Sequence, residues 1–314
     1  CSADGCAVDC TRLKKLGWSS TVNYKDALLI SGHEMMNDNS VFMFSDSYDG
    51  KLNDIQQILL GFLLEVDRIC KKHNIKYFLG GGSLLGAVRH KGFIPWDDDL
   101  DIGMPRADYD KLIAHASEWL PVPYELVCAE NNSKYPFPFA KIQDASTTLI
   151  ERKHSRLGGV YLDVFPLDGV PTGKLSQHCH FAYYKLYKQL LYLIHRDPYK
   201  HGKGINSWVP LICRKLFTSS QIQMKIRKLM TKHDFDNSRF VCDYDDGLKG
   251  IMPKEVVGRP TQFMFEGKEV WGIEKYDKYL TQKYGDYMTI PRLGEQRQHE
   301  FHYLDLKHPY SEFI

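Results

Sequence analysis

Residues 93–104 read Phe-Ile-Pro-Trp-Asp-Asp-Asp-Leu-Asp-Ile-Gly-Met, which places four carboxylates in five positions between apolar flanks. Two ionised carboxylates about 4 Å apart repel each other by roughly 4 kcal/mol at an effective dielectric constant of about 20. A partly buried cluster must therefore take up protons, meet basic side chains or bind a metal ion. A solvated acidic turn is the alternative, but Trp96, Leu100 and Ile102 within the run argue against it, and we favour a metal site.

The period of a β-strand indicates which of these carboxylates act together. If the run is extended, Asp97, Asp99 and Asp101 project to one face, whereas Asp98 and Leu100 point to the other. Hard carboxylate oxygens suit Mg²⁺ or Mn²⁺, which keep open positions for water and for substrate phosphate. We therefore expect Asp97, Asp99 and Asp101 to be metal ligands.

A predicted strand, a glycine turn and a helix start precede the acidic run. Residues 75–79 read as a short strand, and Gly81 and Gly82 lead into Ser83, which we expect to cap a helix over residues 84–91. Glycines let a phosphate approach the backbone, and the free N–H groups of a helix start favour an anion. A glycine triplet alone is usually just a turn, so the prediction of a phosphate site depends on its combination with the acidic run.

Three basic residues end the predicted helix. Arg89 is the best candidate to clamp a diphosphate with two parallel hydrogen bonds, and His90 and Lys91 are secondary candidates for phosphate binding. The alternative for all three is a solvated helix end. We expect the donor phosphates to contact Gly81, Gly82, Ser83 and these basic side chains.

A third element is a buried strand over residues 160–165 that Asp163 interrupts between Leu162 and Val164. A lone carboxylate in such a strand needs a partner. We expect Asp163 to join the same metal site from a neighbouring strand, as a further ligand or as the catalytic base; a structural ion pair is the alternative. Asp168 lies in a Pro-x-Asp-Gly sequence, which is typical of a turn, and we expect it to be structural.

These motifs resemble those of a known family. Residues 81–102 are similar to the signature of the LicD family of bacterial phosphocholine transferases, which has the nucleotidyltransferase fold and to which fukutin and fukutin-related protein are more distantly similar. The features that carry the resemblance are Gly81-Gly82-Ser83, Asp99-Leu100-Asp101-Ile102 and Leu162-Asp163-Val164. Residues 161–168 and 283–288 also fit, so that the resemblance extends over about residues 51–310.

The resemblance implies a fold, a reaction and a cofactor. The fold would be α+β, with a nucleotidyltransferase-like mixed sheet flanked by helices. The reaction would transfer phosphocholine or a related phospho-substituent from a CDP-activated donor to a hydroxyl of a cell-surface glycan or its lipid-linked precursor, with a divalent metal. On charge grounds, one or two ions held by Asp99 and Asp101 would activate the acceptor oxygen and neutralise the leaving phosphate, with Asp163 as base or ligand and Arg89 on the diphosphate.

Two alternatives stay open. A nucleotidyltransferase that moves NMP from an NTP and releases pyrophosphate would use the same site. A non-catalytic glycan-binding or nucleic-acid-binding module would keep the fold without the reaction. The intact acidic run disfavours this second alternative.

Periodicity and motif positions divide the chain into four parts. We expect an N-terminal extension of unknown role (1–50), a nucleotidyltransferase-like catalytic core (51–172), an added basic and aromatic helical subdomain (173–250), and a C-terminal hairpin and helix that complete the catalytic unit (251–314). The expected elements include helices over 52–73, 105–120 and 273–284, strands over 124–128, 139–142 and 147–151, and a hairpin over 263–271.

The third part is unusually basic. Residues 174–233 contain twelve Lys or Arg and one acid, Asp197, a net charge of +11 against +2 for the whole chain. A solvated helical face is the default interpretation. An anionic, lipid-linked acceptor would need such a surface, however, and each basic residue near a bilayer contributes about 1 kcal/mol. We therefore predict salt-sensitive peripheral membrane contact through residues 174–233, and we do not expect a nucleic acid partner.

Composition is that of a globular protein, with 43% hydrophobic and 25% charged residues. The chain has no apolar run long enough to span a bilayer and no signal-peptide pattern, so we expect a cytoplasmic protein, peripheral at the inner face of the membrane. Most of the eight cysteines are scattered in apolar contexts as buried free thiols, whereas Cys1, Cys6 and Cys10 belong to a loosely ordered tail. Arg297, His299 and His302 form a polar cluster that we consider for closing over the donor, although surface histidines are common.

Overall fold

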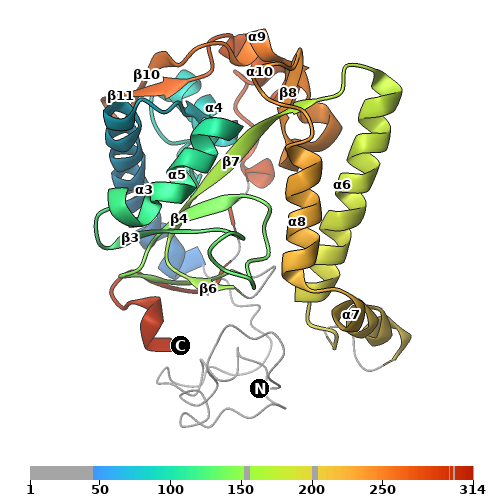
Figure 1. Cartoon of the computed structure of the whole chain (residues 1–314). Coiled ribbons are helices and arrows are strands. Elements are labelled where there is room, and N and C mark those ends of the chain that lie inside the picture. The colour runs from blue at the N-terminus through green and yellow to red at the C-terminus, as the bar shows by residue number, and fades with distance from the viewer. Residues whose placement is uncertain (1–44, 152–155, 200–203, 297, 300, 314) are drawn as a thin grey trace.

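A mixed β-sheet lies at the centre of the molecule, with helices packed around it (Figure 1). This computed structural model describes residues 45–151, 156–199, 204–296, 298–299 and 301–313. Within them, the main path of the sheet has the strand order β10-β11-β1-β2-β7-β4-β3, and β8 and β9 extend it from β7. A smaller sheet has the order β12-β5-β6.

The strands of the large sheet are short except for β7, which crosses its middle. They are β1 (Phe78–Leu79), β2 (Asp101–Pro105), β3 (Tyr124–Val127), β4 (Ala140–Asp144), β7 (Tyr161–Val170), β8 (Phe240–Asp243), β9 (Met252–Pro253), β10 (Thr261–Phe265) and β11 (Lys268–Gly272). The small sheet contains β5 (Thr148–Glu151), β6 (Leu157–Gly158) and β12 (Phe301–Asp305).

The helices fall into two groups. Those around the sheet are α3 (Ser45–His73), α4 (Gly81–Arg89), α5 (Arg106–Trp119), α9 (Lys254–Val257) and α10 (Tyr276–Tyr284). A separate group is formed by α6 (Lys174–His195), α7 (Ile205–Leu216) and α8 (Ser219–Met230), and single 3₁₀ segments are η1 (Tyr244–Gly250), η2 (Leu293–Glu295) and η3 (Tyr310–Phe313). None of the helices in the described part of the chain combines the length and apolarity needed to cross a bilayer.

The main hydrophobic core explains why α3 forms and where it packs. The apolar residues of α3 recur every three or four positions, and Leu59, Phe62 and Leu63 are completely buried. The basic residues of its last turn, Lys71 to His73, complement the negative end of the helix dipole. The helix that the sequence predicts from Leu52 to His73 is thereby confirmed, and the structure extends it back to Ser45.

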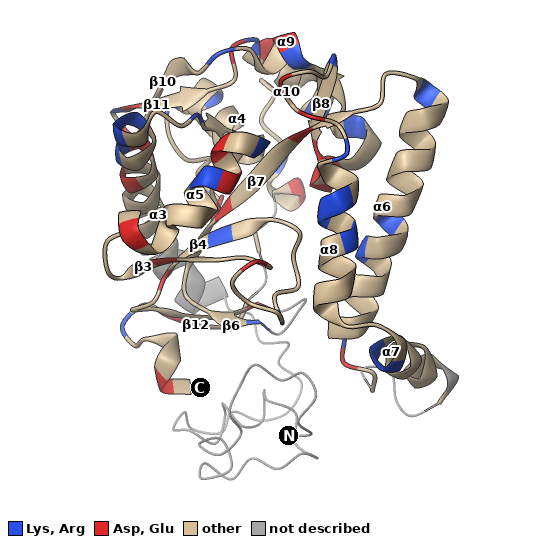
Figure 2. Ribbon diagram, viewed as in Figure 1, with Lys and Arg blue, Asp and Glu red and all other residues tan. Residues whose placement is uncertain are grey.

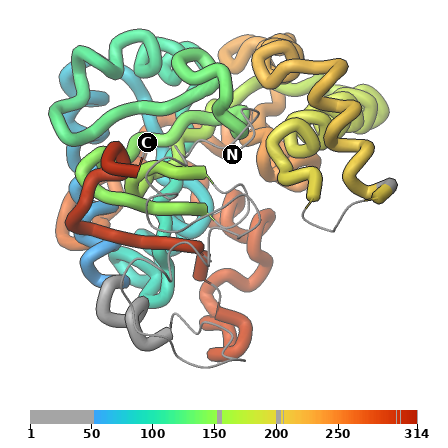
Figure 3. Tube along the Cα trace, turned by 90° about the horizontal axis from the view of Figure 1, so that it is seen from below, coloured from blue at the N-terminus to red at the C-terminus, as the bar shows by residue number. Residues whose placement is uncertain are grey.

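Strand β7 joins this core to the group of three helices. Its first half pairs with β2 in parallel and with β4 antiparallel, and its second half pairs with β8. Beyond it, α6 and α8 pack against each other around a second core that includes Phe181, Tyr184 and Ile222. Figure 3, the view from below, shows these yellow and orange helices beside the sheet.

The expected α+β class, with its mixed sheet flanked by helices, is confirmed, as are the hairpin of β10 and β11 and the helix α5. Two local predictions are wrong. Ser83 does not cap a helix, because α4 already begins at Gly81. Asp168 does not lie in a turn, because β7 continues through this residue. Arg106 neutralises the Asp168 carboxylate inside the protein, so this carboxylate does not need to be at the surface.

The cysteine predictions divide in the same way. Cys70, Cys128, Cys213 and Cys242 are buried free thiols, as expected, whereas Cys179 is exposed because its position on α6 faces away from the second core. The N-terminal cluster of Cys1, Cys6 and Cys10 lies outside the described residues, and so does most of the N-terminal extension.

The buried ion pair of Arg106 and Asp168 gives a test of this architecture. Arg106 Nε lies 2.9 Å from Asp168 Oδ1, and the Asp168 side chain is fully buried, so the substitution Asp168→Asn leaves the buried guanidinium with only the more distant carboxylate of Asp110, 3.6 Å from its Nη1. We expect a loss of about 3–5 kcal/mol in the free energy of unfolding, measured by denaturant titration. As a control, Glu255→Gln breaks the exposed pair with Lys275 and should cost less than about 1 kcal/mol. Similar losses in the two variants would contradict the assignment.

Candidate active site

Four carboxylates converge at the start of two neighbouring strands. Strands β2 and β7 are parallel, and their register places Asp101 directly beside Asp163. Asp97 and Asp99 lie in the irregular segment that leads into β2, so the acidic run becomes a regular strand only from Asp101 onward. The strand interiors supply the apolar support, since Ile102, Leu162 and Val164 are completely buried.

The carboxylates of Asp97 and Asp101 point at the first turn of α4. A Cβ atom on Gly82 would lie 3.0 Å from Asp97 Oδ2, and a Cβ atom on Gly81 would lie 2.9 Å from Asp101 Oδ2. Gly81 also has a φ of +46°, in the left-handed region that favours glycine. The two glycines are therefore required where the backbone passes directly over the carboxylates.

Asp98 is held by the C-terminal segment, and one of its carboxylate oxygens lies within 4.8 Å of a carboxylate oxygen of Asp99. The backbone N–H of His299 donates to Asp98 Oδ2 at 3.0 Å, and His299 Nδ1 lies 2.9 Å from Asp98 Oδ1. On the other side, Gln56 Nε2 of α3 donates to the carbonyl oxygen of Asp97 at 2.8 Å. Segments far apart in the sequence thus fix the backbone of the acidic run.

Ser83 has a different role from the predicted cap. It is buried within α4, and its Oγ accepts a hydrogen bond of 2.8 Å from the backbone N–H of Asp101. The N–H of Gly81 donates to the hydroxyl oxygen of Tyr279 on α10 at 2.9 Å. These bonds tie α4 to β2 and to α10, and they keep the glycines next to the carboxylates.

Basic groups reach the carboxylates but do not balance their mutual repulsion, so the site favours protonated carboxyls when no metal is bound. Burial and the neighbouring Asp99 carboxylate raise the pKa of Asp97 to about 9. Burial, Asp99 and Asp163 raise the pKa of Asp101 well above its usual range. Burial raises the pKa of Asp163 to about 6 even though Lys141 Nζ lies 2.7 Å from its Oδ1 and opposes the shift. A cluster that holds protons so strongly has an unmet need for a cation.

The donor set fits a hard divalent cation such as Mg²⁺ or Mn²⁺. Carboxylate oxygens from Asp97, Asp99, Asp101 and Asp163 are the ligand type that these ions prefer. Asp98, Asp99 and His299 also have potential ligand atoms within 4.8 Å of one another. There, however, the hydrogen bond to Asp98 raises the pKa of His299 to about 10, which is the behaviour of an ion pair and not of a neutral imidazole ligand.

Arg89, His90 and Lys91 lie at the opposite end of α4 from the two glycines. Arg89 Nη1 donates to the carbonyl oxygens of Tyr287 and Thr289 at 2.8 and 3.3 Å, and its Nε lies 2.9 Å from His90 Nε2. Eight residue steps along a helix span about 12 Å. The structure therefore does not bring these basic residues to the carboxylates, and their predicted contact with the donor stays a prediction.

Lys283 is a further cation at the site, and the sequence motifs did not predict it. It lies on α10, its Nζ is 2.8 Å from Asp246 Oδ2 and 3.7 Å from the Cβ position of Gly81, and its charge acts on Asp101. It lines a cavity of about 230 Å³ together with Asp246, Tyr279 and Tyr284. The signal in the sequence was Lys283 itself, at the start of the 283–288 block already noted for its family resemblance and four residues after Tyr279 on the same helix face.

The C-terminal polar cluster is only partly assembled in the described residues. His299 reaches Asp98, as described above, and its Nδ1 lies 3.7 Å from Asp99 Oδ2. His302 lies within β12, and Arg297 falls outside the described residues.

The sequence is similar to known proteins over most of its length. The profile of the LicD/FKTN/FKRP nucleotidyltransferase domain matches residues 74–187, which include all four carboxylates. The lipopolysaccharide cholinephosphotransferase LicD of Haemophilus influenzae is 31% identical over 255 residues, which cover 79% of this chain and 95% of that protein. Human ribitol 5-phosphate transferase FKRP is 60% identical over only 30 residues, 10% of this chain and 6% of that protein.

The raised carboxylate pKa values predict a pH dependence of stability without metal. Because folded Asp97 keeps its proton up to about pH 9, whereas an unfolded aspartate loses it near pH 3.8, the folded state binds more protons between these values. In EDTA the free energy of unfolding should therefore fall as pH rises from 5 to 9, most steeply in the wild type and less in Asp97→Asn. Saturating Mg²⁺ should abolish the fall, because the ion binds deprotonated carboxylates.

Denaturant titrations at a series of pH values measure this slope. The control is Asp236→Asn, which removes an exposed carboxylate elsewhere and should keep the wild-type slope. Equal slopes in Asp97→Asn and the wild type would contradict the electrostatic account.

Proposed function

The chain belongs to the LicD family, and on this premise we propose that it is a metal-dependent phosphotransferase. Its substrates would be a CDP-activated donor, which supplies phosphocholine or a related phospho-substituent, and a glycan or lipid-linked glycan, which accepts it on a hydroxyl. The similarity to a cholinephosphotransferase over 79% of the chain supports the reaction class. The observation that carries the proposal is the convergence of Asp101 and Asp163, in register on parallel strands, under the glycine start of α4.

The donor phosphates are assigned to the first turn of α4. Its glycines present backbone without side chains, and the positive end of the helix dipole favours an anion there. Lys283 adds a fixed positive charge on the same side, next to Gly81. We assign to Lys283 the stabilisation of the negative charge that develops on the leaving CMP. A preoriented cation is effective in this role because it does not need to reorganise during the reaction.

A divalent ion would be held by Asp97, Asp99 and Asp101, with Asp163 as a further ligand or as the base. When bound, such an ion supplies neutralisation of phosphate charge and activation of an oxygen nucleophile. The fit is supported by the hard oxygen donors and by the raised carboxylate pKa values of the metal-free cluster.

In the base role, Asp163 takes the proton of the acceptor hydroxyl. That oxygen forms a new bond to the donor phosphorus, the bond from phosphorus to the CMP oxygen breaks, and CMP leaves. A pKa of about 6 suits a base that works near neutral pH. Lys141 binds Oδ1 of Asp163 and so orients the carboxylate, which leaves Oδ2 as the oxygen that we assign to the proton.

We predict that Asp99→Asn and Asp101→Asn each abolish turnover while the fold remains intact. Incubation with CDP-choline, CDP-ribitol or CTP, followed by assay for CMP and pyrophosphate, identifies both the donor and the bond that breaks. Release of CMP from a CDP donor supports the proposal, whereas pyrophosphate from CTP would favour the nucleotidyltransferase alternative.

Thermal melts of the same variants check the site independently of turnover. Mg²⁺ should raise the melting temperature of the wild type and of the Asp236→Asn control by mass action, but not that of the two site variants. Full activity in either site variant would refute the assignment of the carboxylates.

Donor binding gives a separate prediction. Gly82→Val places a branched side chain against Asp97 and blocks the backbone, and Lys283→Met removes the cation next to Gly81. Each should weaken the binding of CDP-choline, measured by calorimetry in Mg²⁺, by about tenfold or more, the range expected for one charge-assisted hydrogen bond. Gly294→Val is the matched control, because a Cβ atom there meets nothing within 4 Å. Unchanged donor affinity in both site variants would show that this turn is only structural.

A further inference from the structure

Helix α7 turns its large apolar side chains outward. Trp208, Ile212 and Leu216 follow one another at intervals of four residues and are 62%, 54% and 63% exposed. The face that packs against the protein carries the smaller residues Ser207 and Cys213, which are buried. A surface helix normally buries its apolar stripe, so an exposed stripe of this kind marks a surface that meets an apolar partner.

The surroundings of this apolar face are basic. Helices α6, α7 and α8 contain eight Lys or Arg and no Asp or Glu, and two of these cations, Lys188 and Arg227, pair with acids of other elements. Figure 2 shows blue segments without red along all three helices, in contrast to the mixed colours of α3 and α5. The partner of α7 therefore has to combine apolar and anionic character.

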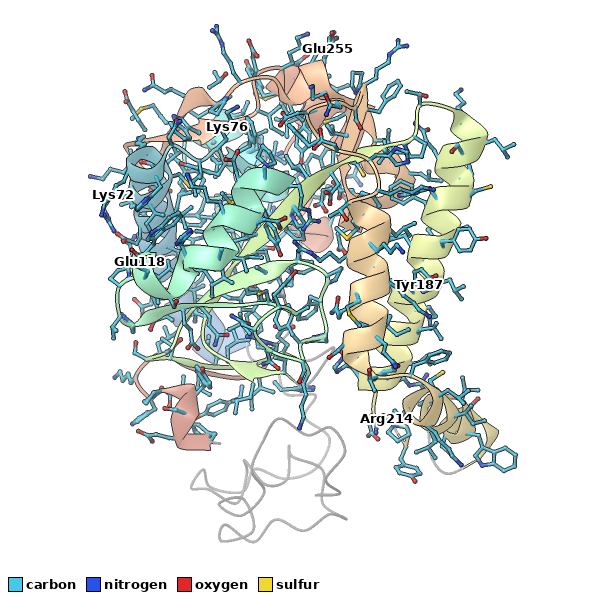
Figure 4. The ribbon with its side chains drawn as sticks, viewed as in Figure 1. Lys72, Lys76, Glu118, Tyr187, Arg214 and Glu255 are labelled. Carbon is cyan, nitrogen blue, oxygen red and sulfur yellow. The ribbon has the colours of Figure 1, made fainter. Side chains whose placement is uncertain are left out.

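Helix α7 is fixed in place. Arg214, which Figure 4 labels where α7 meets the lower end of α6, donates from Nε to the carbonyl oxygen of Ile194 and from Nη2 to that of Arg196, both at 2.8 Å. The guanidinium thus binds one carbonyl of the last turn of α6 and the carbonyl of its C-cap residue, and it holds α7 across the end of α6. These hydrogen bonds hold the exposed stripe of α7 in a fixed position. It lies at the end of the helical group that is farthest from β8 (Figure 1).

We propose that α7 is a membrane-docking helix that lies in the interface of a bilayer containing anionic lipids. The side chains of Trp208, Ile212 and Leu216 would enter the boundary between headgroups and acyl chains, and the basic residues beside them would meet the headgroups. An anionic bilayer offers both kinds of contact at once. A second copy of this chain would instead bring an equally basic surface against the first, and repulsion disfavours that occupant.

This proposal sharpens the sequence-based expectation of membrane contact through residues 174–233. The apolar faces of α6 and α8 are largely used within the second core, where Leu191, Ile222 and Ile226 are buried. Among the described residues of this region, α7 carries the densest group of exposed apolar side chains. The contact does not depend on the proposed reaction, because it requires neither donor nor metal.

Vesicle sedimentation of the full chain tests the proposal. Vesicles of phosphatidylcholine alone are compared with vesicles of phosphatidylcholine and phosphatidylglycerol, each at about 0.1 M and about 1 M NaCl, where the Debye length falls from about 10 to 3 Å. We expect binding to the anionic vesicles at low salt and a strong loss at high salt. Equal binding to both lipid compositions, or binding to neither, would overturn the proposal.

Matched variants locate the contact on α7. Trp208→Ser and Ile212→Ser should lower the fraction bound to anionic vesicles, whereas Leu293→Ser, at an exposed apolar position elsewhere, should not. Lys215→Gln should weaken binding about fivefold, the equivalent of one surface charge, and Lys268→Gln on the distant hairpin should have no effect. Wild-type binding in all the α7 variants would overturn the assignment to this helix.

Two further measurements separate docking from other causes. Circular dichroism melts should show that the α7 variants keep their fold, since the replaced side chains are exposed. Sedimentation velocity should show the same oligomeric state for the wild type and Trp208→Ser in the absence of lipid. A change of oligomeric state in that variant, without any change in vesicle binding, would instead identify α7 as an interface between copies and refute membrane docking.

Discussion

Repulsion among four carboxylates is the constraint on which the rest of the site depends. Burial of the apolar strand interiors forces β2 and β7 side by side, and their register sets Asp101 against Asp163. The hydrophobic gain from these strands opposes the electrostatic cost of the carboxylates at their start. The protein offsets part of that cost with Lys141, Lys283 and His299, which come from β4, α10 and the C-terminal segment. What remains is a concentrated negative charge that a divalent cation would satisfy.

The glycines of the signature have two different tasks around this charge. Gly81 and Gly82 leave space for the carboxylates of Asp101 and Asp97, as their close Cβ positions show. Gly86 instead lets the chain fold back, because a Cβ atom there would lie 2.4 Å from the carbonyl oxygen of Gly92. Gly81 and Gly82 shape the phosphate side of the proposed site. Gly86 and Gly92 allow the tight loop that leads from α4 to the acidic run before β2. The glycines of this one sequence block thus contribute to the proposed binding site and to folding for the same reason, because they have no side chain.

The helical group beside the sheet has a hydrophobic core of its own. Its core is built from α6, α8 and the far half of β7, so it can keep its shape without contributing a carboxylate to the cluster. The connection through β7 nevertheless fixes its position relative to the site, since one continuous strand carries both Asp163 and Val170. Such an arrangement would hold the proposed docking surface and the proposed reaction centre in a constant relation.

The sequence by itself determined the class of the fold, most of its helices and the grouping of the acidic residues. These depend on local signals: the apolar period of α3 and α5, the hairpin pattern of β10 and β11, and the density of aspartates before β2. Only the tertiary structure decided which partners complete the site. Lys283 and His299 approach the acidic run from positions about 180 and 200 residues away, and no local period encodes such a contact. Asp168 and Ser83 were misjudged for the same reason, because a buried ion pair and a hydrogen bond to a neighbouring strand override the turn and cap preferences of isolated segments.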